Sequence, residues 1–321
     1  MPGHIPVLRE AVGRLFADVE AGTLIDGTLG LGGHAEAILD ARKDLALLGI
    51  DRDRDALTTA RKRLDRFGDR VRLRHGNYAD VAEHAAAASG PIVGIFLDIG
   101  VSSLQLDVAE RGFSFLRDGP LDMRMDSSSG APASAWLATA AQTEIAEVLR
   151  TYGEERYADR IARSIVEARL RGPIETTLDL RDIIHRAVPR AYFDEPIDPA
   201  TRTFQAIRIR INGELDALQR GLETGFDVLA PGGILAVISF HSLEDRIVKI
   251  FLREKAAACI CPPDLPDCVC DKQVEAEILT RKPIRADEDE IAENSRSRSA
   301  RLRAARKLDT GSAGSRASNS A

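Results

Sequence analysis

The sequence has no long hydrophobic run, no excess of positive charge and no Cys-x-x-Cys pair. Its longest apolar stretches, residues 45–50 and 234–238, have the length of buried strands and fall well short of the roughly 20 residues that span a bilayer. The opening residues, Met-Pro-Gly-His-Ile-Pro, do not have the pattern of a signal peptide. We therefore expect a cytoplasmic protein that has no membrane contact.

The net charge of −6 excludes a general attraction to nucleic acid. Any contact with phosphates must therefore come from local clusters of Lys and Arg. The 321 residues are 44% hydrophobic and 29% charged, which is typical of a soluble globular protein with one large domain or two smaller ones.

Cysteine is confined to one short segment, as Cys259, Cys261, Cys268 and Cys270. In a reducing compartment such a cluster more often binds a metal than forms disulfides. The usual zinc knuckle is Cys-x-x-Cys, and the Cys-x-Cys spacing found here fits it less well. A zinc site, a redox-labile loop and a merely structural loop all stay open.

Residues 24–51 have the pattern of a strand, a glycine turn, a helix, a second strand and an acid. Gly30, Gly32 and Gly33 allow a tight turn, and the helix that follows offers free N–H groups to a ligand. Asp51 comes 19 residues after Gly32, where nucleotide-binding sheets commonly place a carboxylate on the ribose hydroxyls. The stretch predicts a site for a nucleoside cofactor.

Asp26 favours S-adenosylmethionine over NAD at this site. The glycines do not follow the G-x-G-x-x-G order of a dinucleotide site, and an acid just before them would repel a pyrophosphate. The same acid can accept a hydrogen bond from the ammonium group of S-adenosylmethionine. The alternative is an ordinary strand-loop-helix turn in which the glycines serve geometry only.

Strands and helices alternate along the first hundred residues, which predicts an α/β fold with a parallel sheet. Asp26, Asp51, Tyr78 and Asp98 each follow a predicted strand. Ligands of open parallel sheets bind outside the carboxyl ends of the strands. The four residues are therefore expected to converge on one site.

Residues 105–212 lack strand patterns and form a predicted helical insertion, after which the strand at 234–238 resumes the sheet. The expected domains are residues 1–104 and 213–307 for the sheet and 105–212 for the insertion, with a disordered tail at 308–321. Arginines of the insertion could hold phosphate, although interspersed acids favour solvated helix faces for most of them. They are Arg156, Arg160, Arg163, Arg202, Arg208 and Arg210, of which the last three are less diluted by acid.

A basic segment, residues 296–307, contains six Lys or Arg and no acid. That density suits RNA phosphates, and a solvated basic tail is the competing interpretation.

Seven motifs together resemble one family. They are DGTLGLGGH (26–34), LDIGVSS (97–103), ERGFSF (110–115), DGPLDMRMD (118–126), YGEER (152–156), ATRTFQA (200–206) and SFHSLEDR (239–246). In this order they are similar to the bacterial small-subunit ribosomal RNA methyltransferase family H, also called MraW. The resemblance covers roughly residues 4–307.

The resemblance implies a Rossmann-like class I methyltransferase sheet with an inserted helical domain. It also implies methyl transfer from S-adenosylmethionine to the N4 amine of one cytosine in the decoding region of 16S rRNA, on a nearly assembled small subunit. A homodimer is left open. The implied cofactor contacts are Gly32, Gly33, His34, Asp51, Tyr78, Asp98 and Gln105. Some family members lack the cysteines, so no metal is expected in catalysis.

Asp98 is the predicted acceptor nearest the chemistry. A cytosine amine is a poor nucleophile, so the enzyme must orient it and remove a proton. His241 is a second catalytic candidate, as a base or a contact of the base, with a structural histidine as the alternative. Phe113, Phe115 or Phe240 could stack on the extruded cytosine.

Two rival functions use the same sequence features. A DNA amino-methyltransferase would share the cofactor half, but its insertion should then carry a strongly basic groove, which the mixed charges at 105–212 do not show. A ribosome-assembly factor could bind the cofactor and RNA without transferring a methyl group.

Overall fold

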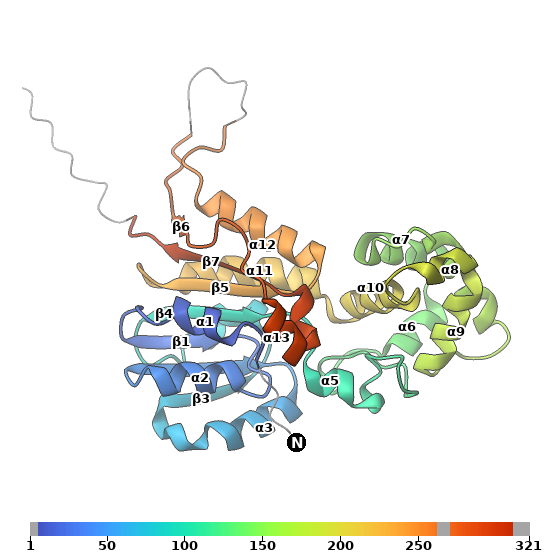
Figure 1. Cartoon of the computed structure of the whole chain (residues 1–321), viewed down its shortest axis with the longest axis horizontal. Coiled ribbons are helices and arrows are strands. Elements are labelled where there is room, and N and C mark those ends of the chain that lie inside the picture. The colour runs from blue at the N-terminus through green and yellow to red at the C-terminus, as the bar shows by residue number, and fades with distance from the viewer. Residues whose placement is uncertain (1–5, 262–269, 311–321) are drawn as a thin grey trace, which may run out of the picture. The chain divides into compact units, whose positions relative to one another are not determined.

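A seven-stranded sheet forms the centre of the first part of the molecule (Figure 1). The computed structural model describes residues 6–261 and 270–310. Within them the strand order is β3-β2-β1-β4-β5-β7-β6. The strands are β1 (Gly22–Asp26), β2 (Leu45–Asp51), β3 (Val71–His75), β4 (Ile92–Asp98), β5 (Ile234–Ser239), β6 (Ala276–Ile278) and β7 (Arg301–Lys307).

Strands β1 to β5 run parallel to one another, whereas β7 is antiparallel to both β5 and β6. Strands β2 and β3 extend the sheet on one side of β1, whereas β4 and β5 extend it on the other side. Open α/β sheets bind ligands at the point where the strand order reverses in this way. The predicted α/β class with an inserted helical region is confirmed.

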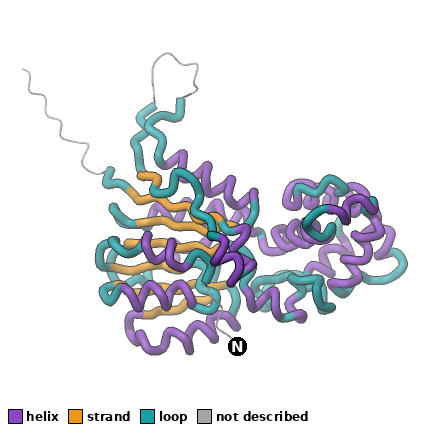
Figure 2. The backbone as a smooth tube through the Cα atoms, viewed as in Figure 1, coloured by secondary structure: helices purple, strands orange, loops and turns teal. Residues whose placement is uncertain are grey.

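Helices cover both faces of the sheet, as the tube in Figure 2 shows. Alternate strand residues point to opposite faces, so Leu24 packs with α1 (Arg9–Leu15), α2 (Gly33–Ala41) and α3 (Arg54–Leu64). The next residue, Ile25, packs with helices of the other face. These helices are α4 (Val81–Ala85), α11 (Glu214–Val228) and α12 (Ser242–Lys255).

The helical insertion has a hydrophobic core of its own. Its helices are α5 (Ser103–Asp107), α6 (Ala133–Thr139), α7 (Gln142–Gly153), α8 (Ala158–Arg169), α9 (Thr177–Ala187) and α10 (Ala200–Asn212). Thr176 caps α9 through a reciprocal pair of hydrogen bonds with Asp179.

The chain divides into two compact units, residues 1–100 with 217–321 and residues 101–216. The predicted domain boundaries were 104/105 and 212/213. Gly213 adopts φ 58° and ends α10 before α11 begins.

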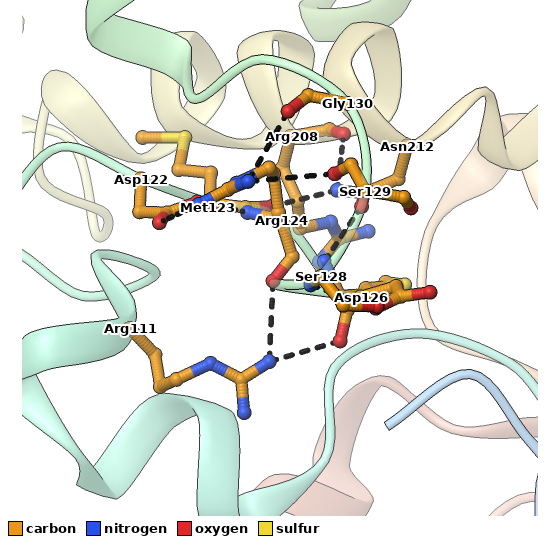
Figure 3. A network of polar contacts seen from close by, with 11 residues as sticks. Arg111, Asp122, Met123, Arg124, Asp126, Ser128, Ser129, Gly130, Arg208 and Asn212 are labelled. Carbon is orange, nitrogen blue, oxygen red and sulfur yellow. Dashed lines mark hydrogen bonds and ion pairs between the residues drawn. The ribbon is translucent and has the colours of Figure 1, made fainter. Parts of the chain in front are cut away.

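Hydrogen bonds hold the loop between α5 and α6 (Figure 3). Asn212, the last residue of α10, accepts from Met125 N at 2.8 Å and donates to Met123 O at 2.8 Å. Arg111 donates to the carbonyls of Arg124 and Met125 at 3.1 and 2.9 Å. These bonds hold Met123, whose φ of 63° is rare outside glycine.

The basic segment forms a strand inside the sheet, so the interpretation as a solvated tail is wrong. The residues that separate the arginines of β7 are small or apolar, and they are buried: Leu302, Ala304 and Ala305. Arg303 pairs with Asp245 of α12 at 2.6 Å. Lys307 donates to the carbonyls at the end of α11 at 2.8 and 2.9 Å. Part of the positive charge that the sequence suggested for RNA binding is therefore paired within the protein.

The tail that was predicted to be disordered begins at residue 308. Leu308 N donates to Glu275 O at 2.8 Å, and residues 311–321 lie outside the described residues. Within the described ranges, none of the helices has the length and apolar character to cross a membrane.

Candidate active site

The acids that follow β1, β2 and β4 meet at the carboxyl edge of the sheet. Asp26, Asp51 and Asp98 end adjacent strands, and the negative charges of Asp98 and Asp51 both act on Asp26. The glycine turn leads from β1 to α2 at the same edge, with Gly30 and Gly32 at φ 52° and 78°. The predicted convergence of the strand-end acids is therefore present in the first unit.

Asp51 is tied to the glycine turn by its carboxylate. One oxygen accepts from Gly30 N at 2.7 Å and the other from Asp53 N at 2.8 Å. Burial raises the pKa of Asp51 to about 6, and these backbone hydrogen bonds oppose that rise because they favour the charged form. The glycine turn and the second strand are thus held in one rigid arrangement.

Asp26 is almost fully buried, with 1% of its surface exposed. Burial raises its pKa to about 8, against the hydrogen bond from Thr28 N, and the charges of Asp98 and Asp51 raise it further. Burial and the neighbouring acids therefore favour the protonated form of this side chain when no ligand is bound. A cationic group bound nearby would favour the carboxylate form, since it replaces the solvation that burial removes.

Asp98 has an acceptor oxygen pointing at no donor. Among the described residues, Oδ1 of Asp98 is buried without a hydrogen-bond partner, while Oδ2 lies 3.8 Å from His34 Nε2. Burial raises the pKa of Asp98 to about 7, and the charge of Glu244 adds to the rise. A carboxyl group that titrates near neutrality in a cluster of acids is typical of a functional site.

Thr28 holds Asp98 in place, a contact that the sequence did not predict. Its hydroxyl accepts from Asp98 N at 2.6 Å, so it joins the turn after β1 to the end of β4. The sequence signal was the hydroxyl residue at a position where methyltransferase turns usually have glycine. A side chain at this position can make a hydrogen bond that glycine cannot.

Tyr78 and His34 complete the edge. Tyr78 follows β3 and packs against two glycines: a Cβ atom on Gly27 would lie 2.8 Å from Cβ of Tyr78, and one on Gly221 would lie 2.6 Å from its Cδ2. His34, in the first turn of α2, packs on Phe96 with ring centroids 4.7 Å apart. The absence of side chains at 27 and 221 makes room for the Tyr78 ring.

Comparison with known proteins identifies the family. The sequence profile of the MraW methylase family matches residues 1–308. The chain is 51% identical to a ribosomal RNA small subunit methyltransferase H of Pelobacter propionicus, over 95% of this chain and 98% of the relative. The chain belongs to the MraW methylase family.

Two further matches accompany this assignment to MraW. A ribosomal RNA small subunit methyltransferase H of Heliobacterium modesticaldum is 49% identical, over 95% of this chain and 98% of the relative. An rRNA methylase structure from Streptococcus thermophilus matches with a TM-score of 0.43 and 10% identity, covering 95% of this chain and 99% of the other.

In this MraW chain His241 is the N-cap of α12. Its Nδ1 accepts from Glu244 N at 3.4 Å, and Glu244 returns the contact by accepting from His241 N at 3.2 Å. His241 Nε2 also lies 3.0 Å from Oε1 of Glu244. The structural alternative is therefore present, and a role in catalysis stays a prediction.

Two substitutions separate the capping role of His241 from a catalytic one. We expect His241→Ala to lower the free energy of unfolding by roughly 1 kcal/mol, whereas His241→Asn keeps a cap and stays near the parent value. Denaturant unfolding and methyl transfer are measured for both. Transfer near the parent rate in His241→Asn would assign the histidine to capping alone, whereas loss of transfer in both variants would make the imidazole catalytic.

Gln105, the remaining residue implied by the MraW resemblance, belongs to the second unit. Its side-chain Oε1 accepts from the backbone N of Ser102 at 3.0 Å, and its backbone N donates to Ser102 Oγ at 3.2 Å. The side chain is buried within α5 and the turn before it. Its cofactor contact remains a prediction.

The arginines of the MraW insertion are more occupied than the sequence suggested. Arg208 makes two 2.9 Å bonds to Glu214, Arg210 lies 3.3 Å from Glu144, and Arg202 donates to the carbonyl of Glu154. The view that Arg208 and Arg210 are less diluted by acid is wrong, because the sequence does not show which acids lie nearby in space.

Proposed function

We propose that this protein transfers the methyl group of S-adenosylmethionine to the N4 amine of one cytosine in the decoding region of 16S rRNA. The observation that carries the proposal is the buried Asp98 Oδ1, an acceptor without a donor beside the glycine turn of an MraW chain. The names of the relatives, ribosomal RNA small subunit methyltransferase H, support rRNA of the small subunit as the substrate.

The residues at the sheet edge fit the cofactor. S-adenosylmethionine supplies, when bound, an electrophilic methyl group on a sulfonium and carries an ammonium group and a ribose diol. The buried Asp26 and the partly buried Asp98 have pKa values raised to about 8 and 7, and both suit a ligand with positive charge. We assign Asp51 to the ribose hydroxyls, the turn at Gly32, Gly33 and His34 to the amino-acid end, and Tyr78 to the adenine.

Asp98 is the proposed acceptor for the cytosine amine. The amine lone pair forms the new N–C bond as the bond between the methyl carbon and sulfur breaks, and one amine proton then moves to Asp98. Its pKa of about 7 makes proton uptake feasible near neutrality. Glu244 and His241 are positioning residues in this account, because Glu244 raises the pKa of Asp98 and pairs with His241.

Phe240 is the proposed stacking partner of the extruded cytosine. It follows β5 and lies beside Gly100, where a Cβ atom would come within 3.2 Å of the ring. Phe113 is buried, and Phe115 packs edge-on against Phe204 at 4.8 Å, so both have packing roles. A base that leaves its stack needs such an aromatic surface.

Transfer of labelled methyl groups tests the proposed function. Purified protein is incubated with labelled S-adenosylmethionine and with small subunits from a strain that lacks the enzyme. We expect about one methyl group per subunit, located on cytosine by mass spectrometry. Free 16S rRNA serves as the comparison for the assembled subunit. No incorporation into either substrate would overturn the proposal.

The helical unit offers an RNA-binding face on α8. Arg160 and Arg163 are exposed and one turn apart, and in the described part of the chain neither pairs with an acid. Reversing both charges, Arg160→Glu with Arg163→Glu, should raise KM for small subunits roughly tenfold and leave kcat near the parent value. The matched control, Arg9→Glu with Arg14→Glu on α1, should change neither constant.

An unchanged KM in the α8 variant, or an equal rise in the α1 control, would remove this docking face.

The partner and compartment complete the proposal. The protein acts on the small ribosomal subunit in the cytoplasm, and a homodimer, which the sequence leaves open, can be tested by analytical ultracentrifugation of the purified chain.

A further inference from the structure

Three cysteine sulfurs converge outside the active site. The Sγ atoms of Cys259, Cys261 and Cys270 all lie within 4.8 Å of one another, in the connection between α12 and β6. Cys268 lies outside the described residues. The Cys-x-Cys spacing, which fitted zinc poorly in the sequence, therefore does not keep the thiols apart.

The sulfur–sulfur distance between Cys259 and Cys270 matches a tetrahedral thiolate site. A zinc ion with Zn–S bonds of about 2.3 Å places its sulfurs about 3.8 Å from one another. Cys259 Sγ and Cys270 Sγ are 3.7 Å apart, far beyond the roughly 2.05 Å of a disulfide. In addition, Cys259 Sγ accepts from Cys261 N at 3.3 Å, a contact that stabilises a thiolate.

The connection that carries the cysteines is a hairpin closed at its base. Glu275 N donates to Lys255 O at 2.8 Å, and the two side chains pair at 2.8 Å. Cys259 follows one end of this base and Cys270 precedes the other, so they face each other across the two arms. Residues 256–274 have no helix or strand where they are described, and loops of this length need a constraint to stay in one conformation.

Among the described residues of this connection, 256–261 and 270–274, none is buried, so no apolar core provides the constraint there. Cys259 is exposed, and the neighbouring Ile260 is 64% exposed. Soft thiolates in such a cluster select zinc over harder divalent ions. We propose that Cys259, Cys261 and Cys270 bind a structural zinc ion that fastens the two arms of this hairpin. The site is separate from methyl transfer, because none of its ligands belongs to the strand-end cluster.

Metal content of the full-length, untagged protein, purified without chelator, tests the site. We expect about one zinc per chain by plasma mass spectrometry, and a fall to roughly a tenth of that value in Cys270→Ser and in Cys259→Ser. Ile260→Ser, which lies between two ligands and removes no thiol, should keep the zinc. Titration with Co²⁺ should give the charge-transfer bands of a thiolate site in the parent and in Ile260→Ser only.

Folding of each variant is checked by circular dichroism and by binding of S-adenosylhomocysteine, both of which should be unchanged. Absence of zinc from the parent protein, equal zinc in Cys270→Ser, or a disulfide between Cys259 and Cys270 after alkylation would each overturn the site. If the parent protein contains zinc but transfers no methyl group, the proposed function fails and the zinc site stands.

Discussion

Replacing Asp98 with Asn is expected to lower kcat for methyl transfer by roughly 10² to 10⁴-fold, the usual contribution of a positioned base. The substitution keeps the shape of the side chain and removes its ability to take a proton. Single-turnover transfer to small subunits, with protein in excess, measures the chemical step directly. A rate within a few-fold of the parent would exclude Asp98 as the acceptor.

The fold should survive this substitution. Because burial raises the pKa of Asp98 from 3.8 to about 7, its contribution to stability falls as the pH rises between these values. Asn carries no charge, so Asp98→Asn should unfold at the same or a higher denaturant concentration at pH 8. A lower midpoint would indicate that lost structure explains the lost activity.

The pH profile follows from the same pKa. The carboxylate is the active form, so kcat/KM of the parent should fall about tenfold per unit below about pH 7 and level off above it. The profile of Asp98→Asn should lose this step. The range from about pH 5.5 to pH 8 brackets the expected step at about 7. A parent profile that is flat over this range would contradict the assignment of Asp98 as the proton acceptor.

Replacing Asp51 with Ala is expected to weaken binding of S-adenosylhomocysteine roughly 100-fold, because two hydrogen bonds to a charged group are lost. The change also frees the amides of Gly30 and Asp53, which Asp51 now holds. Asp51→Asn keeps one acceptor and should lose about tenfold. Isothermal titration calorimetry gives both dissociation constants.

Asp44 provides the matched control. It is an acid just before the opposite end of the same strand, and it pairs with Arg42 at the surface at 2.8 Å. Asp44→Ala should therefore leave cofactor affinity unchanged. Equal affinity in Asp51→Ala and the parent would remove Asp51 from the cofactor site.

The sequence predicted the first five strands because four are short apolar runs that end on a turn or a polar residue, and the other, β3, alternates apolar and basic residues. It also predicted that Asp26, Asp51 and Asp98 converge, since the carboxyl ends of parallel strands share an edge. These features are local or follow from one topological rule, and a single sequence therefore carries them.

Pairing across the chain was beyond the sequence. Strand β7 was hidden because its arginines suggest a solvated surface, and their partner Asp245 lies more than 50 residues away. The bond from Asp98 N to Thr28, the cap formed by His241 and the pair between Arg208 and Glu214 likewise depend on which residues meet in the folded chain.

The most direct test of methyl transfer to 16S rRNA is mass spectrometry of that rRNA from a strain in which the gene for this protein is deleted. We predict that one N4-methyl group on a decoding-region cytosine disappears, returns with the parent gene and does not return with the Asp98→Asn gene. An unchanged set of methylated cytosines in the deletion strain would contradict the account.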